Sequence, residues 1–164
     1  MASWSAFAAA APEVAAVGAG LLEEHHLAYL ATVRPPGQDL YGLRRDGAPR
    51  VHPVSPFFVD GRLFVATPPS SPKAGDQHRD GRYAMHCLPG QDDAEFRIRG
   101  RSRLLPPGPD RDAVIERGPH YARDEDCIFE YDIEEAASAY WVNVGQPGTY
   151  AVRSRWAERG GMAP

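Results

Sequence analysis

Residues 50–73 read RVHPVSPFFVDGRLFVATPPSSPK, and this stretch decides the fold. From Val51 to Val59 it is rich in β-branched and aromatic residues, and Arg62–Thr67 repeats that composition after Asp60-Gly61. An Asp-Gly pair is a strong hairpin signal, because glycine readily adopts the positive φ that a type I′ turn requires. The sequence therefore predicts two antiparallel strands joined by a tight turn.

The same stretch ends on the start of a helix. Ser71 is a suitable N-cap residue, and Pro72 at the first helical position has no N–H to leave unpaired. A helix N-terminus presents free N–H groups and a partial positive charge, which favour a phosphate. Ser71 adds a hydroxyl and Lys73 adds a full charge. The hairpin is therefore predicted to lead into an anion site.

Length and composition indicate a soluble globular chain. It has 164 residues with 43% apolar and 24% charged side chains, which suits a single core, and its 16 glycines and 16 prolines favour short elements and many turns. The net charge of −4 argues against a dedicated nucleic-acid binder. No apolar run approaches the ~20 residues of a membrane span, and the alanine-rich start lacks the positive segment of a signal peptide. A cytoplasmic location is expected, with neither a nucleic-acid nor a membrane partner.

The cysteines and the paired histidines predict no metal site. Cys87 and Cys127 each lie in an apolar run that reads as a strand, so they are expected to be buried thiols and not a disulfide or zinc ligands. His25 and His26 are adjacent on a predicted helix, and adjacent helical residues do not face one site.

Short elements follow one another along the rest of the chain. Residues 1–11 are predicted to be a flexible arm and residues 153–164 a weakly ordered tail, which leaves 12–152 as one domain. Helices are predicted at 12–26, 72–80 and 110–117, and further strands at 27–34, 82–88, 95–105, 127–134 and 139–152. The strand at 27–34 is apolar on both faces and is expected to be buried, and 35–49 reads as a polar loop. About six strands at hairpin spacing predict an antiparallel barrel.

Two of these strands carry complementary charges. Arg97, Arg99, Arg101 and Arg103 share one face of the strand at 95–105, while Glu130, Asp132 and Glu134 share one face of the strand at 127–134. Opposite charges directly across an antiparallel pair stabilise it. The two strands are therefore predicted to be neighbours, in preference to an arginine face that binds nucleic acid.

The order of these motifs resembles one known family. A strand, a Pro-Arg-Val hairpin, an Asp-Gly turn, Ala-Thr and then Ser-Pro-Lys-Ala are similar to the pyridoxamine 5′-phosphate oxidase-like family of flavin-binding split β-barrels, over about residues 20–136. The resemblance implies a mainly β fold with a few short helices, a six-stranded antiparallel Greek-key split barrel. It also implies a homodimer with a cofactor in each of two clefts between the subunits. We expect FMN, with a deazaflavin coenzyme as the alternative.

The resemblance also implies which residues bind the cofactor. The strand at 50–55 would lie beside the flavin ring and its ribityl chain, Ala66 and Thr67 would lie near them, and Ser71 and Lys73 would hold the phosphate. A deazaflavin has a longer anionic tail, for which Arg44, Arg45 and Arg79 are candidates. The complete expected set is Arg50, Val51, His52, Pro53, Val54, Ser55, Ala66, Thr67, Ser71 and Lys73.

The function implied is a flavin-dependent oxidoreductase that acts on a small organic substrate, which the sequence does not identify. In the family, the true oxidases of pyridoxamine phosphate end with a Trp and an Arg-X-His group that serves the flavin and the substrate phosphate. No Arg-X-His group follows Trp141 or Trp156 here, so the resemblance does not extend to oxidation of pyridoxamine phosphate. His52, with an ordinary pKa of ~6.5, is the candidate for proton transfer. The alternatives are a deazaflavin-dependent reductase and a non-enzymatic barrel that binds flavin or, through His78 or His86, haem.

Overall fold

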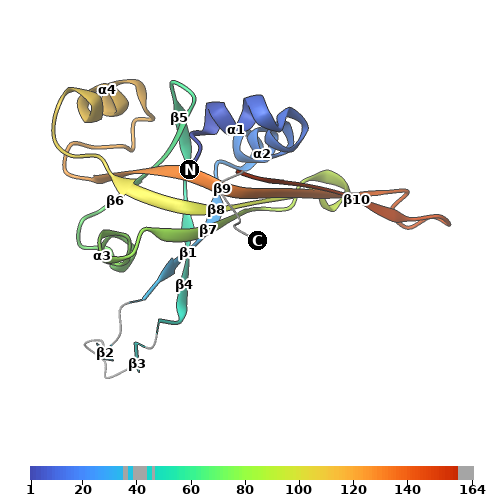
Figure 1. The fold of residues 1–164 in the computed structure, drawn as a ribbon, viewed down its shortest axis with the longest axis horizontal. Helices are drawn as coiled ribbons and strands as arrows, with labels where there is room; N and C mark the ends of the chain where they lie inside the picture. Colours follow the sequence, from blue (N-terminus) through green and yellow to red (C-terminus); the bar gives the residue numbers. More distant parts are fainter. Residues whose placement is uncertain (35–36, 39–43, 46, 159–164) are drawn as a thin grey trace, which may run out of the picture.

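The computed structural model describes residues 1–34, 37–38, 44–45 and 47–158, and it is built on one curved antiparallel sheet (Figure 1). The helices are α1 (Trp4–Ala10), α2 (Pro12–His25), α3 (Pro72–Arg79) and α4 (Pro109–Arg117), with a 3-10 turn at Gln91–Asp93. The strands are β1 (Ala28–Val33), β2 (Gly37–Gln38), β3 (Arg44–Arg45), β4 (Pro49–Val54), β5 (Phe57–Val59), β6 (Arg62–Thr67), β7 (Arg82–Cys87), β8 (Glu95–Leu104), β9 (Cys127–Val142) and β10 (Tyr150–Ala157).

Eight of these strands form the sheet, in the order β4-β1-β7-β8-β9-β6-β5, with β10 also paired to β9. The mainly β split barrel predicted from the sequence is therefore confirmed. The strand count exceeds the expected six partly because β2 and β3 pair with each other within the 35–49 stretch that was read as a loop. No helix of the described residues is long and apolar enough to cross a membrane.

The predicted hairpin is present, but its first strand is interrupted. Asp60 and Gly61 both have positive φ, 50° and 69°, as a type I′ turn requires. Ser55 and Pro56 divide the run from Val51 to Val59, so that β5 pairs with β6 while β4 pairs with β1. The interruption moves β4 to the edge of the sheet.

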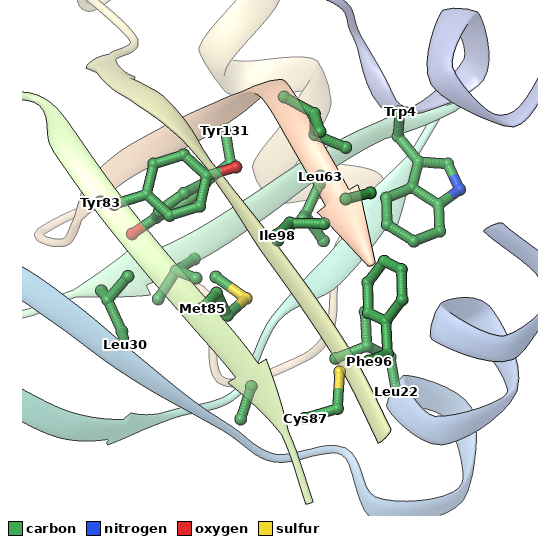
Figure 2. Packing of buried hydrophobic residues seen from close by; sticks show 14 of the residues in the cluster. Trp4, Leu22, Leu30, Leu63, Tyr83, Met85, Cys87, Phe96, Ile98 and Tyr131 are labelled. Atoms are coloured by element: carbon green, nitrogen blue, oxygen red, sulfur yellow. The ribbon is translucent and has the colours of Figure 1, made fainter. Parts of the chain in front are cut away.

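The N-terminal residues are part of the core, so the prediction of a flexible arm at 1–11 is wrong. Trp4 and Phe7 on α1 are buried, and the ring centroid of Trp4 lies 5.9 Å from that of Phe96 on β8 (Figure 2). Gly18 on α2 faces the same ring, and a Cβ there would lie 2.5 Å from Phe96. The glycine therefore permits the close approach of α2 to the sheet, and the helix predicted at 12–26 forms.

The C-terminal prediction is wrong for the residues from Arg153 to Ala157, which belong to β10 and not to a tail. The first part of β9 pairs with β6 along one edge, and the rest of that edge pairs with β10. An unpaired strand edge leaves backbone hydrogen bonds unmade, and β10 supplies them. Trp156 on β10 also packs against Phe7, with ring centroids 5.1 Å apart.

The predicted pairing of the arginine and acidic strands is confirmed, because β8 and β9 are antiparallel neighbours. Arg103 Nη2 lies 2.7 Å from Glu130 Oε2, and Arg101 Nε lies 3.8 Å from Glu134 Oε1. A register shift after Arg99 pairs that residue with Glu135. These arginines therefore have acidic partners within the sheet.

Candidate functional site

The alternation of β4 divides the expected site residues between two faces. Arg50 and His52 lie opposite Thr32 and Leu30 of β1, which are buried, so these four side chains share the inner face. Val51 points the other way and is 60% exposed. The strand at 50–55 therefore serves two separate surfaces.

A charged cluster occupies the inner face, where α3 packs on β1 and β4. We call Arg50, His52, Lys73 and Asp76 the inner cluster. The Asp76 carboxylate is 1% exposed. Its Oδ2 accepts a hydrogen bond from Thr32 Oγ1 at 2.9 Å and lies 3.1 Å from Arg50 Nε.

Lys73 is the one lysine in the sequence. It is half-buried, and burial lowers the pKa of its ammonium from the ordinary value of 10.5. The ion pairs of the described residues do not include Lys73. A partly desolvated cation without a carboxylate partner is suited to an incoming anion.

His52 is held in its neutral form at pH 7. Burial lowers the pKa of its imidazole below 6.5, and the positive charges of Lys73 and Arg50 lower it further. The nearby Asp76 charge opposes this shift. A neutral imidazole has one nitrogen that donates a hydrogen bond and one that accepts.

Three buried polar atoms of the expected site residues have no hydrogen-bond partner. They are Arg50 Nε, His52 Nε2 and Thr67 Oγ1. Among the described residues, no other buried side-chain nitrogen or oxygen atom lacks a hydrogen-bond partner. Arg50 Nε is within ion-pair distance of Asp76, but its N–H is not aligned for a hydrogen bond, so that contact is one of charge alone. Buried polar groups are normally paired, and an unpaired one costs about 1–3 kcal/mol. All three belong to residues singled out from the sequence.

The remaining expected residues are placed as follows. Ser71 is at the N-cap of α3, as predicted, and its side chain makes no capping hydrogen bond. Ala66 is half-buried beside Thr67. The side chain of Val54 belongs to the hydrophobic core, and its backbone pairs with Ala28 of β1. The carbonyl of Ser55 accepts a hydrogen bond from the Tyr121 hydroxyl at 3.5 Å, a neighbour that the sequence did not indicate.

The opposite face of the sheet carries a groove that the sequence did not predict. This outer groove has a volume of about 810 Å³ and crosses β4, β1, β7, β8, β9 and β10. Tyr29, Ala31 and Val51 are among its apolar lining residues, and Arg97, Arg99 and Arg155 add charge. The strand at 27–34 was expected to be buried on both faces, but Tyr29 is 46% exposed. That expectation is wrong because the covering helices lie on the other side.

His86 faces this outer groove in one defined tautomer. Its Nδ1 lies 2.7 Å from the carbonyl oxygen of Cys87. A carbonyl only accepts hydrogen bonds, so Nδ1 carries a proton, and in a neutral ring the lone pair is then on Nε2. A histidine that ligates a metal commonly has this arrangement.

The other residues that the sequence suggested as ligand contacts have less favourable surroundings. Arg79 donates a hydrogen bond to Asp76 Oδ1 at 3.1 Å, while the side chains of Arg44 and Arg45 lie outside the described residues, as does much of the 35–49 stretch. His78 Nε2 lies 3.9 Å from the Cys127 thiol. Cys87 is buried and Cys127 half-buried, and both are free. The described residues hold no cluster of three side chains suited to a metal ion.

Comparison with known proteins identifies the fold. No family model and no curated protein matches the chain. A Clostridium acetobutylicum protein related to general stress protein 26, of the pyridoxinephosphate oxidase family, aligns with a TM-score of 0.57 at 12% identity, over 83% of this chain and 91% of its own. General stress protein 26 from Bacillus anthracis aligns with a TM-score of 0.57 at 13% identity, over 75% of this chain and 91% of its own.

A haem-binding protein from Mycobacterium smegmatis shares the fold as well, with a TM-score of 0.55 at 14% identity. The alignment covers 84% of this chain and 57% of the other. The chain therefore has the split-barrel fold of the pyridoxamine 5′-phosphate oxidase-like proteins. Proteins with that fold differ in what they bind, so the function has to be argued from the inner cluster and the outer groove.

Proposed function

We propose that the protein is a flavin-binding oxidoreductase that holds the phosphate of FMN on the inner cluster. The observation that carries the proposal is that buried polar atoms of His52 and Thr67 have no hydrogen-bond partner, while Arg50 turns only its Nε toward Asp76. The partly desolvated charge of Lys73 and the N-terminus of α3 supply what a phosphate needs beside them. FMN offers a dianionic phosphate and several hydroxyl groups to these donors.

Each residue of the site has a part in this proposal. Bound flavin would supply the redox chemistry, taking electrons from a small organic donor and passing them to a second substrate that acts as the acceptor. Arg50 and Lys73 bind the phosphate, Ser71 donates its hydroxyl to it, and Thr67 Oγ1 donates to the sugar chain. His52, neutral at pH 7, accepts or donates one hydrogen bond through Nε2 and is positioned to move a proton to or from the bound molecules.

We also propose that the protein is a homodimer that closes over the outer groove. Tyr29 and Val51 are both exposed, and they are among the apolar groups that line the groove. Exposed apolar patches of this kind commonly mark protein interfaces. A second copy seated there would bury Val51, whose strand carries Arg50 and His52 on its other face.

The primary test is a titration of the purified chain with FMN and, in parallel, with riboflavin, which has the same ring and no phosphate. We expect FMN fluorescence to be quenched on binding, with an affinity far above that of riboflavin. Equal affinities, or no binding of either molecule, would contradict the proposal. A parallel titration with a deazaflavin coenzyme decides between the two cofactor classes.

The single lysine makes a direct footprint possible. Amine-reactive reagents can modify Lys73 and the α-amino group of Met1, which pairs with Glu158 away from the site. Mass spectrometry after brief labelling should show Lys73 protected by FMN, while the labelling of Met1 stays unchanged. Riboflavin should protect Lys73 much less. Equal labelling of Lys73 with and without saturating FMN would place the phosphate elsewhere.

A second candidate function, haem binding in the outer groove, is favoured by the tautomer of His86. Its free Nε2 lone pair is the ligand that haem iron takes from histidine. Arg97 and Arg155 line the same groove and can pair with the carboxylate groups of haem, while Arg99 is already paired with Glu135. Haem titration should then give a Soret band that is lost in His86→Ala and kept in His78→Ala. A spectrum of free haem in the wild-type protein would exclude this function.

A further inference from the structure

We infer that Asp76 is a positioning residue for the anion site, one that holds the Arg50 guanidinium where a phosphate monoester meets it. The inference rests on the proposed function of the inner cluster and adds to it a carboxylate that binds no ligand itself. Asp76 acts through its buried contacts with Arg50 and Thr32.

The geometry sets the carboxylate behind the arginine. Thr32 and Arg50 are directly opposite each other on β1 and β4, so their side chains leave the same face of the sheet. Asp76 on α3 meets both, with Oδ2 2.9 Å from Thr32 Oγ1 and 3.1 Å from Arg50 Nε. One carboxylate therefore connects a helix to two neighbouring strands.

Asp76 contacts one end of the Arg50 guanidinium and leaves the other end for a ligand. Asp76 approaches Arg50 at Nε, while the two terminal nitrogens are the groups that suit bidentate binding of a phosphate. An unrestrained arginine side chain has many rotamers, and fixing it before the ligand arrives lowers the entropic cost of binding. Because Arg50 is about a quarter exposed, its outer end is open to a ligand while its inner end is held.

A carboxylate this close to an anion site would weaken binding if charge alone mattered. Its negative charge repels a phosphate, so removal of that charge would raise affinity on electrostatic grounds. A positioning role predicts the reverse, namely that removal of the Asp76 charge lowers the affinity for the phosphate. Asp76 is 1% exposed and also accepts a hydrogen bond from Arg79, so its charge is already balanced by two cations. The two explanations therefore differ in the sign of one measurement.

Other contacts hold α3 in place without Asp76. The Tyr131 hydroxyl donates a hydrogen bond to Gln77 Oε1 at 2.6 Å, and both residues are buried. Ala74 on the same helix is fully buried in the core. Asp76→Asn, which keeps the shape and removes the charge, is therefore expected to fold.

The experiment compares FMN and riboflavin affinities in the wild type, Asp76→Asn, Arg50→Gln and the double variant. Loss of the buried Arg50–Asp76 ion pair frees the guanidinium, so FMN binding should weaken by at least about tenfold in Asp76→Asn. Riboflavin affinity should not change. In the Arg50→Gln background the Asp76 substitution should have little further effect, because Asp76 acts through that arginine.

Two further variants keep the test decisive. Asp80→Asn, at the end of the same helix and paired with Arg82, is the matched control and should bind FMN as the wild type does. If Asp76→Asn is too unstable to measure, Thr32→Val removes the 2.9 Å hydrogen bond alone and should weaken FMN binding in the same direction. Tighter FMN binding, an equal loss for riboflavin, or additive effects in the double variant would overturn the inference. Failure of the wild type to bind FMN would instead contradict the proposed function.

Discussion

The two faces of β4 present opposite surfaces from one short strand. The inner face carries Arg50 and His52, each with a buried nitrogen that has no hydrogen-bond partner, and Arg50 pairs with Asp76 of α3. The outer face carries Val51, which is exposed over a wide groove. Alternation along a strand places neighbouring residues on opposite sides, so a contiguous motif contributes to two sites.

This difference has a consequence for function. The inner cluster is small, charged and rigidly tied to a helix N-terminus, which suits one phosphate group. The outer groove is broad, and its lining combines apolar side chains with arginines, which suits a flat ligand or a second subunit. A substitution on one face should therefore leave the chemistry of the other face intact.

The largest expected effect is on the inner face. Replacing Arg50 with Gln and Lys73 with Met together removes both cations proposed to bind the phosphate, and each charge-assisted contact contributes about 1.5–3 kcal/mol. We expect FMN affinity to fall by more than about a hundredfold, measured by fluorescence titration, with riboflavin affinity nearly unchanged. Arg123→Gln, an exposed residue paired with Glu125, is the control. Wild-type FMN affinity in the double variant would contradict the proposal that the inner face binds the phosphate.

The next effect is on the outer face. Val51→Arg introduces a charge at the proposed subunit interface, and burying an unpaired charge is strongly unfavourable. The dimer dissociation constant should rise by at least about tenfold in analytical ultracentrifugation. Val144→Arg, at a similarly exposed position in the turn before β10, should leave the dimer unchanged. A wild-type monomer at high concentration would contradict the dimer itself.

The pH dependence of binding sharpens the assignment of Lys73. Its ammonium form binds the phosphate, and burial lowers its pKa, so FMN affinity should begin to fall at a pH below the 10.5 of an ordinary lysine. It should also fall below about pH 6, where the phosphate gains a proton. The ratio of FMN to riboflavin affinity isolates this effect, because both molecules carry the same ring. Lys73→Met should abolish the alkaline fall and keep the acid one.

The smallest effect concerns His52 and the stability of the fold. Its pKa is lowered in the folded state, so the unfolded chain binds the proton more readily and stability falls as the pH drops through 6.5. His52→Gln should remove that part of the acid loss, under about 1 kcal/mol. Urea unfolding at pH 7.5 and 5.5 measures it, with the exposed His120→Gln as control. Identical acid losses in the wild type and in His52→Gln would mean that His52 is not perturbed.

Local sequence patterns predicted most of the helices and strands, but not the structure of the N-terminal and C-terminal segments. The Asp60-Gly61 turn, the start of α3 after Ser71 and the end of α4 at Arg117 all lie where the sequence placed them. The arm was misread because its contacts are remote in the sequence: Trp4 is buried through its packing on Phe96. The tail was misread because the strand predicted at 139–152 was ended too early. Arg153–Ala157 continues the hairpin that β10 forms with the preceding strand, β9.

The sequence by itself determined the hairpin, the helix start and the residue types of an anion site, because turns, caps and alternation depend on neighbours within a few positions. Only the tertiary structure decided which face each residue serves. It joined Asp76 to Arg50 and Thr32 across three elements, and it formed the outer groove from six strands. The physical reason is that burial and pairing depend on the curvature and order of the whole sheet.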